Sequence, residues 1–442
     1  MNSRWLVLLL LPFLAHALVV STVVWQEDPV TLGWLDHAVL GLTFAWLGIL
    51  AVILRRGKSP AKLLLASWSV LLAVLACEGA VRLLYPEPPP GLPWPPIAIS
   101  APAADTMKGV SGRIDFTVNS FGVRGPEVDL DDMDLRILCV GGSTTQCRYV
   151  TDAASWPWKL QDELAPRLGR RVFVGNAGKP GHMTAEHDRL LQDYALAPRF
   201  DWVIALCGIN DANVSVAGNH DRRLTHPELD IVTPPHVAAP WYAYYRGLGI
   251  VRLLRALERR IRSDSLVQDD AGEWYRDARR QRRDALARQT LTAPPDNLPD
   301  MLDDYRQDLR NLIATCRRLE LKLVLLTQPT RFEADLPPEV AETFIVQHHE
   351  GAYTPDAYAK IMRAFNETLL EVAEDEGVPA IDLANMLPKD GTVFYDECHF
   401  NISGCAQVAA ILVEFFEERE GQPAAGVSRP RGGGEVREEP AE

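Results

Sequence analysis

The sequence predicts an α/β domain, a three-layer sandwich with a five-stranded parallel sheet, preceded by three transmembrane helices. Two observations predict it. From residue 135 onward, short apolar runs alternate with longer amphipathic ones, which is the order expected when helices connect parallel strands and cover both faces of their sheet. Before residue 85, three apolar runs each reach roughly 20 residues, the length that a helix needs to cross a bilayer.

The apolar runs lie at residues 5–25, 35–54 and 63–84, and residues 1–85 are predicted to form a three-span anchor in membrane lipids. Cations precede the first run and separate the second from the third, whereas the loop between the first and second carries Glu27 and Asp28. The cations are Arg4, Arg55, Arg56, Lys58 and Lys62. Because basic loops stay in the cytoplasm, the protein is expected to be multi-pass, with everything after residue 84 outside the cytoplasm. Residues 4–17 also resemble a cleaved signal peptide, and cleavage would leave that placement unchanged.

Residues 86–106 are expected to be a proline-rich linker, because prolines crowd residues 86–96 and favour an extended spacer. A folded domain over residues 107–420 follows. Residues 212–300 interrupt its α/β rhythm and are expected to form a helical insertion, packed on the sheet or acting as a lid. The tail, residues 421–442, is rich in glycine, proline and charge and is expected to be disordered.

Each element of the domain has its own signal. Apolar runs between turn residues predict strands at 114–118, 135–140, 172–174, 202–206, 321–326 and 379–383. Helical periodicity predicts helices at 156–168, 184–195, 302–319, 358–376 and 406–420. Ser155 is the expected N-cap of the first of these helices, with Pro157 in its first turn.

Charge and cysteine content exclude several classes of function. The 442 residues carry a formal net charge of -14, which argues against a nucleic-acid partner. The seven cysteines lack the spacing of zinc ligands or of a disulfide framework. Cys139 and Cys207 lie in apolar strands and are expected to be buried thiols, while Cys398 and Cys405 could pair in an oxidising compartment.

Polar segments follow four of the predicted strands. Ser143 stands after the glycine pair that ends the strand at 135–140, and 176–181, 208–211 and 396–399 follow later strands. Each segment alone has an ordinary explanation, since glycine and asparagine favour turns and Ser143 could simply cap a helix. Ligands of open α/β sheets bind outside the carboxyl ends of the strands. The four segments together therefore predict a site at that edge.

These segments resemble the four motif blocks of the SGNH (GDSL-like) hydrolase family. Gly141, Gly142 and Ser143 stand for its Gly-Asp-Ser block, so the aspartate is missing here. The glycine of the second block falls on Gly181, with Gly178 as the alternative. The third block, Gly-x-Asn-Asp, is matched by Gly208, Asn210 and Asp211, and the last, Asp-x-x-His, by Asp396 and His399. The resemblance covers roughly residues 135–416 and implies the flavodoxin-like SGNH fold for this membrane-anchored chain.

The chemistry of acyl transfer suits these residues. Serine is a weak nucleophile at neutral pH, so His399 would accept its proton while Asp396 holds the imidazole. The resemblance assigns the oxyanion hole to the backbone N–H groups of Ser143 and Gly181 and to the Asn210 amide. No metal ion or organic cofactor is required.

The predicted function is that of an extracytoplasmic serine esterase or deacylase, acting on an O-acyl ester of a cell-envelope glycan or lipid. An O-acyltransferase would use the same residues, with a sugar hydroxyl in place of water and an acyl donor supplied by a membrane partner. A non-catalytic glycan-binding scaffold is the reading from a different class. Gln328 and Arg331, just after the strand at 321–326, are candidate substrate-binding residues.

Overall fold

The computed structural model describes residues 91–94, 96–103, 107–216, 280–281, 283–332, 336 and 351–421, with a few helical residues between 69 and 81. The chain divides into two compact units, and every element below belongs to the unit formed by residues 88–231 and 263–442. Most of the three predicted spans, the signal-peptide alternative, most of the insertion and nearly all of the tail lie outside the described residues. Within the described part of the chain, no helix has the length and apolarity that a membrane crossing requires.

A five-stranded parallel sheet forms the centre of the domain, with the strand order β4-β3-β5-β7-β9. Its strands are β3 (Leu135–Gly141), β4 (Val172–Asn176), β5 (Trp202–Leu206), β7 (Lys322–Leu326) and β9 (Ala380–Ile381). Along the chain, β3 is the first strand of this sheet; β4 lies on one side of it and β5, the next strand, lies on the other side. This reversal makes a topological switch point at the carboxyl end of β3, which is where open α/β sheets bind ligands.

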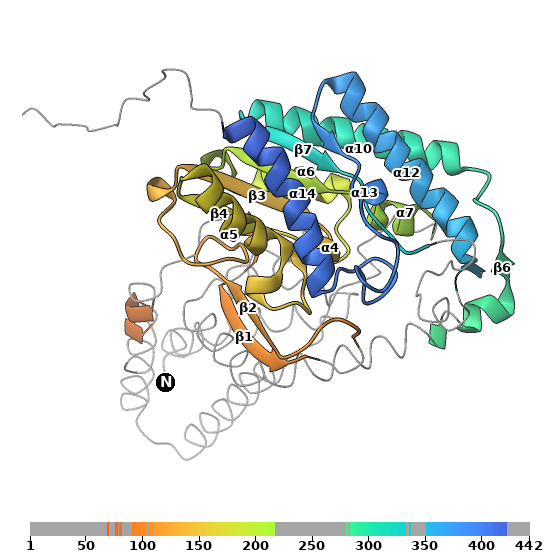
Figure 1. The fold of residues 1–442 in the computed structure, drawn as a ribbon, viewed down its shortest axis with the longest axis horizontal. Helices are drawn as coiled ribbons and strands as arrows, with labels where there is room; N and C mark the ends of the chain where they lie inside the picture. Colours follow the sequence, from red (N-terminus) through yellow and green to blue (C-terminus); the bar gives the residue numbers. More distant parts are fainter. Residues whose placement is uncertain are drawn as a thin grey trace, which may run out of the picture. The chain divides into compact units, whose positions relative to one another are not determined.

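Helices cover both faces of the sheet (Figure 1). Among the described residues, the helices of the domain include α4 (Ser143–Gln146), α5 (Trp156–Leu168), α6 (Thr184–Asp193), α7 (Ile209–Val216), α10 (Leu298–Arg318), α12 (Pro355–Glu376), α13 (Leu383–Met386) and α14 (Ile402–Glu420). Three single 3-10 turns accompany them: η1 (Leu130–Asp132), η2 (Asp152–Ala154) and η3 (Ala197–Arg199). Apolar side chains of α6, α7, α10 and α12 form one hydrophobic core with the sheet. Those of α5, α13 and α14 form the other core on the opposite face.

The strands are apolar on both faces, as a doubly covered parallel sheet requires. In β3, Leu138 and Val140 belong to the first core, whereas Ile137 and Cys139 belong to the second. All four side chains have no exposed surface. The predicted α/β architecture with a five-stranded parallel sheet is therefore confirmed.

The predicted linker differs from the structure, because part of residues 86–106 is folded onto the domain. Strand β1 (Ile97–Pro102) pairs antiparallel with β2 (Arg113–Val118). Before it, the Trp94 indole N–H donates to Gly178 O at 3.0 Å. Gly91 approaches the end of α6 so closely that an added Cβ would lie 1.8 Å from Asp193 O. A second short pair, β6 (Thr290–Leu291) and β8 (Ala352–Tyr353), is parallel.

The cysteine predictions have mixed outcomes. Cys139 and Cys207 are buried, as predicted. The pairing of Cys398 with Cys405 is not present, since both are free thiols. Cys405 lies instead beside Cys147, with 3.9 Å between the two sulfur atoms, because α14 packs against the turn that follows α4.

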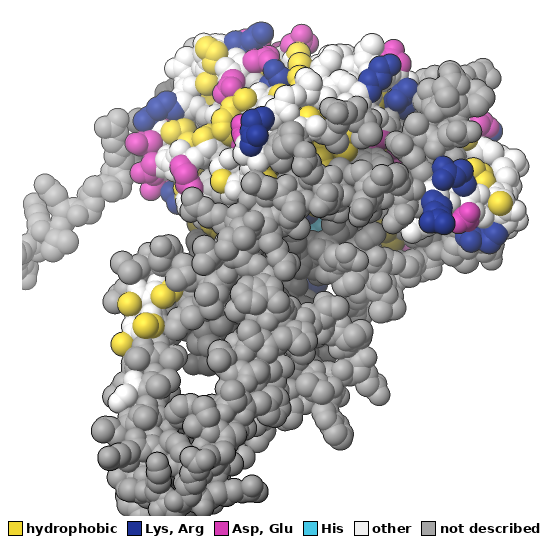
Figure 2. Space-filling view, turned by 90° about the horizontal axis from the view of Figure 1, so that it is seen from below, with side chains coloured by type: hydrophobic (Ala, Val, Ile, Leu, Met, Phe, Trp, Pro, Cys, Tyr) yellow, Lys and Arg dark blue, Asp and Glu magenta, His cyan; other side chains and the backbone are white. Residues whose placement is uncertain are grey.

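Surface charges of both signs lie interspersed on the described part of the face in Figure 2. Among the described residues of the domain, exposed ion pairs include Arg167 with Glu417 and Lys360 with Asp356. Exposed pairs of this kind contribute little to the free energy of folding, typically about 0 to 1 kcal/mol each. The stability of the domain therefore rests on the two cores.

Candidate active site

Three predicted site residues form a continuous chain of hydrogen bonds. Ser143 Oγ lies 2.7 Å from His399 Nε2, and His399 Nδ1 lies 2.6 Å from Asp396 Oδ2. When Nδ1 carries the ring proton, Nε2 can accept a proton from the serine hydroxyl. The geometry is that of a nucleophile, a general base and a residue that orients the base.

The loop that carries Asp396 and His399 is closed by the aspartate itself. Asp396 Oδ1 accepts the backbone N–H groups of Cys398 at 3.0 Å and His399 at 2.7 Å, while Oδ2 is bonded to the imidazole. An aspartate readily accepts N–H groups two and three residues ahead in a turn. The two-residue spacing therefore lets one carboxylate shape the loop and hold the base.

The charge of Asp396 controls the proton affinity of His399. Burial lowers the pKa of His399, but Asp396 and, to a lesser extent, Cys398 raise it, and together they hold that pKa well above its ordinary value. Asp396 is 1% exposed, so water screens this attraction little. Tyr395 stacks on the imidazole, with the two ring planes 5° apart and their centroids separated by 5.5 Å.

Ser143 is presented by a turn with little space beside its two glycines, Gly141 and Gly142. Strand β3 ends at Gly141, and Ser143 is the first residue of α4. A Cβ on Gly141 would lie 2.0 Å from Thr145 Oγ1, and one on Gly142 would lie 2.3 Å from Asn210 Nδ2. In this chain the Asn210 amide thus fills the space that a side chain at position 142 would need.

Asn210 and the residue after Gly181 lie close to Gly142, which precedes Ser143: an added Cβ at Gly142 would lie 2.3 Å from Asn210 Nδ2 and 3.7 Å from His182 O. Asn210, at the start of α7, uses one N–H of its amide to bond His182 O at 2.9 Å, and a second donor remains on the same nitrogen. Gly181 has a φ of 74° in the loop after β4. The alternative, Gly178, donates its N–H to Asn176 Oδ1 at 2.9 Å.

Asp211, next to Asn210, joins two loops of the site. Its Oδ1 accepts from Thr184 N at 2.9 Å, and its Oδ2 accepts from Gly208 N at 3.2 Å. Burial raises the pKa of Asp211 to about 6. This carboxyl group therefore ties the loop after β5 to the start of α6, which fixes the position of Asn210.

The two candidate substrate-binding residues, Gln328 and Arg331, differ in burial. Gln328 is 1% exposed, and its amide accepts from Thr144 Oγ1 at 3.1 Å and donates to Pro329 O at 2.9 Å. In the structure it supports the residue next to Ser143, and its contact with substrate stays a prediction. Arg331 is half-buried, and its backbone N–H donates to Glu397 O at 2.9 Å within the His399 loop.

Sequence reasoning missed two polar residues that contact the Ser143 helix. Arg124 donates to Gln146 O and Cys147 O, and Asn176 donates to Thr145 O. Asn176 is the last residue of strand β4 and opens the segment 176–181 that the sequence singles out, so position alone could have found its role. Arg124 follows no strand of the main sheet, and no local signal marks it.

Among the described residues, one group of three has the arrangement of metal ligands: Asp396, Cys398 and His399, with ligand atoms within 4.8 Å of one another. The ligand atoms of Asp396 and His399 are already hydrogen-bonded to each other. A cation at this place would replace the bond that orients the base.

The comparisons with known proteins agree with this geometry. The sequence profile of the GDSL-like Lipase/Acylhydrolase family matches residues 139–406, which include Ser143, Asn210, Asp396 and His399. No curated protein matches the chain.

Several solved structures are similar at low identity. LAE5, an α/β hydrolase enzyme from the metagenome of Lake Arreo in Spain, is 14% identical, with a TM-score of 0.35 over 65% of this chain and 96% of its own. The acetylxylan esterase Axe2 of Geobacillus stearothermophilus is 14% identical, with a TM-score of 0.34 over 67% and 98%. The lipase/acylhydrolase of Enterococcus faecalis is 17% identical, with a TM-score of 0.34 over 64% and 96%. Likenesses this low carry no argument about the substrate of this chain.

Proposed function

This chain belongs to the GDSL-like lipase and acylhydrolase family and is a serine hydrolase of ester bonds, and from that premise we propose that it removes O-acyl groups from a cell-envelope glycan or lipid. The observation that carries the proposal is the hydrogen-bonded chain from Ser143 Oγ through His399 to Asp396. Ser143 is the nucleophile, His399 the general base and Asp396 the residue that orients it. The three predicted spans anchor the protein, with the catalytic domain outside the cytoplasm.

The first half of the reaction forms an acyl-serine. Ser143 Oγ attacks the acyl carbonyl while its proton passes to His399 Nε2, 2.7 Å away. The N–H groups of Ser143 and Gly181 and the Asn210 amide stabilise the negative oxygen of the tetrahedral intermediate. The intermediate collapses, the C–O bond to the alcohol breaks, and His399 returns the proton to the leaving alkoxide.

Water completes the cycle. It attacks the acyl-serine carbonyl and gives a proton to His399. The second tetrahedral intermediate then collapses, the bond from the acyl carbon to Ser143 Oγ breaks, and His399 returns the proton to Oγ, which releases the carboxylic acid and the free Ser143 hydroxyl. Asp396 remains ionised throughout and stabilises the imidazolium each time it forms. His399 therefore accepts one proton and returns it in each half of the reaction.

The experiment for catalysis uses the Ser143→Ala variant. Wild-type protein is expected to hydrolyse p-nitrophenyl acetate and to react covalently with a fluorophosphonate at Ser143, whereas the variant should do neither. Ser403→Ala is a matched control, because Ser403 is exposed in the first turn of α14 and should be dispensable. Hydrolysis by Ser143→Ala at the wild-type rate would show that this serine is not the nucleophile.

The cellular placement and the substrate have separate tests. A reporter enzyme that is active only outside the cytoplasm, fused after Asp105, is expected to be active; inactivity would contradict the proposed topology. Envelope extracts incubated with wild-type protein should release a carboxylic acid that Ser143→Ala does not release. The identity of that acid gives the acyl group, and the deacylated fraction gives the glycan or lipid.

A further inference from the structure

The helix that begins with Ser143 is too short to hold its own geometry. α4 spans Ser143–Gln146, and its end is closed by a single bond from Cys147 N to Ser143 O at 3.0 Å. A helix leaves its last carbonyl groups without partners inside the helix, and an isolated turn is unstable in water. The direction of the Ser143 side chain must therefore be maintained by contacts from other elements.

Arg124 supplies several of these contacts at the far end of α4. Its Nη1 donates to Gln146 O at 2.6 Å and to Cys147 O at 2.7 Å. Its Nη2 donates to Val150 O at 2.5 Å in the following turn. A positive charge at the carboxyl end of a helix is favourable, and the planar guanidinium can bond several carbonyl oxygens at once.

The guanidinium is itself fixed and buried. Arg124 Nε donates to Asp152 Oδ1 at 2.7 Å, and the side chain lies over the Phe116 ring at 4.5 Å from its centre. Arg124 is 2% exposed and Asp152 is 7% exposed. The position of the guanidinium is therefore strongly restricted, because any movement that breaks one of these contacts would leave a buried charge or polar group without a partner.

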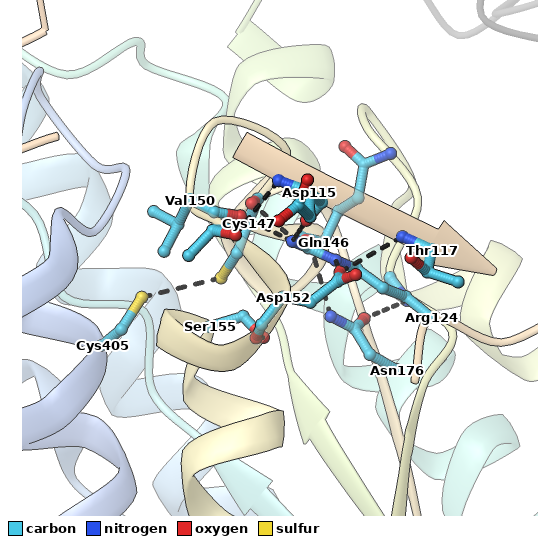
Figure 3. A network of polar contacts seen from close by, with 12 residues as sticks. Asp115, Thr117, Arg124, Gln146, Cys147, Val150, Asp152, Ser155, Asn176 and Cys405 are labelled. Carbon is cyan, nitrogen blue, oxygen red and sulfur yellow. Dashed lines mark hydrogen bonds and ion pairs between the residues drawn. The ribbon is translucent and has the colours of Figure 1, made fainter. Parts of the chain in front are cut away.

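Asn176 holds the same helix from the neighbouring strand, as Figure 3 shows. Its side-chain N–H donates to Thr145 O at 2.7 Å. Its backbone exchanges two hydrogen bonds with Arg124, of 2.8 and 3.0 Å. Arg124 and Asn176 thus bind the carbonyl oxygens of three consecutive residues, beginning two positions after Ser143.

We propose that Arg124 is a positioning residue for the Ser143 nucleophile, holding the carboxyl end of α4 so that Ser143 Oγ stays within reach of His399 Nε2. The inference rests on the proposed function, because it needs Ser143 to be the attacking group. Asp152 and Asn176 hold Arg124 and α4 in register. Since a displacement of about 1 Å at a reacting atom can lower a rate on the order of 100-fold, this role has a kinetic signature.

The test compares Arg124→Lys with the same change at Arg136. Lysine keeps the positive charge but loses the planar set of donors. Arg136 pairs with Asp201 through two bonds of 3.0 Å at the opposite end of β3 from Ser143, so Arg136→Lys is a matched control for loss of a guanidinium–carboxylate pair. Both full-length variants, with wild type and Ser143→Ala, are reacted with a fluorophosphonate well below their unfolding temperatures.

The reaction gives two readouts. Its amplitude counts the sites that are folded, and its rate constant reports the geometry of the nucleophile in those sites. In Arg124→Lys the rate constant is expected to fall about 10- to 100-fold, with kcat for p-nitrophenyl acetate falling in parallel and KM changing little. Arg136→Lys should keep the wild-type rate constant, even where its amplitude is lower.

Each other outcome overturns the inference. A wild-type rate constant in the folded fraction of Arg124→Lys would show that Arg124 is only a structural residue, while the proposed function would stand. An equal loss in Arg136→Lys would trace the effect to general destabilisation. Labelling of Ser143→Ala at the wild-type rate would remove both the proposed function and the positioning role.

Discussion

Asn210 is the residue that most directly tests the oxyanion hole. It bonds His182 O through one N–H of its amide, and the proposed role uses the other. Asn210→Ala is expected to lower kcat on the order of 100- to 1000-fold, the usual effect of losing one such donor, because the negative oxygen loses a fixed partner. Thermal unfolding should change little, since Asn210 is half-buried and its side chain holds one backbone carbonyl. Unchanged turnover would remove Asn210 from the oxyanion hole.

The pH dependence follows from the Asp396–His399 pair. His399 must be neutral to accept the Ser143 proton, and its pKa lies above the ordinary histidine value of about 6.5. We therefore expect kcat/KM to rise with pH through an apparent pKa above that value, because protonated His399 predominates below it.

Asp396→Asn is the control for this prediction. It removes the carboxylate that raises the pKa and leaves the burial that lowers it, so the residual activity should titrate at lower pH. The midpoint is read from fluorophosphonate labelling rates at a series of pH values. A wild-type midpoint at or below about 6.5 would contradict the assigned interaction.

At the scale of elements, two glycines contact the surroundings of α4 differently: Gly142, in the turn between β3 and α4, and Gly178, in the loop after β4. An added Cβ at Gly142 would meet the end of the flexible Asn210 side chain, at 2.3 Å from Nδ2. An added Cβ at Gly178 would meet backbone, at 2.4 Å from Gln146 N. The side chain can move away, whereas the backbone of α4 cannot move without disrupting the helix.

Gly142→Ala is therefore expected to keep the unfolding temperature while lowering kcat, because it displaces the Asn210 amide. Gly178→Ala should lower the free energy of unfolding by about 1 to 3 kcal/mol, as overpacking of a close contact does. Thermal unfolding and p-nitrophenyl acetate turnover, measured on both variants, separate the two effects. The reverse pattern would mean that Asn210 does not occupy the space beside Gly142.

The limits of the predicted elements have physical reasons. The strand at 202–206 and the helix at 156–168 were predicted with the bounds that the structure has, since both are defined by their own apolar pattern. α12 and α14 start three and four residues earlier than predicted, at Pro355 and Ile402. Their starts are set by the side chains of Thr354 and Asn401, which accept the N–H groups of Ala357 and Gly404. Apolar periodicity does not register such caps.

At the scale of the whole molecule, the segment before β2 is part of the folded domain. A protein starting at residue 104, as the predicted linker suggests, would lose β1 and Trp94, whose indole bonds Gly178 O in the loop that packs on α4. It is expected to unfold at a lower temperature than a protein starting at Pro88, since deleting a buried tryptophan typically costs about 3 to 5 kcal/mol. Its turnover should also fall. Equal unfolding temperatures and equal turnover would show that residues 88–103 contribute nothing to the domain.

The sequence by itself determined the α/β class, the four strand-end segments and the pair Asp396 and His399. These depend on local patterns: apolar runs make strands, glycines permit the turn at Ser143, and a two-residue spacing suits one closed loop. The chemistry of the site could therefore be predicted from the sequence before the fold was known.

Tertiary structure decided what depends on contacts between distant residues. It paired β1, which lies within the predicted linker, with β2, buried Gln328 beneath Thr144, and brought Arg124 to the end of α4. A single arginine or glutamine carries no sign of which carbonyl group it will meet, because that depends on the packing of the whole chain. The residues that perform the chemistry form sequence motifs, whereas a residue that aims the nucleophile is recognised only by what it contacts.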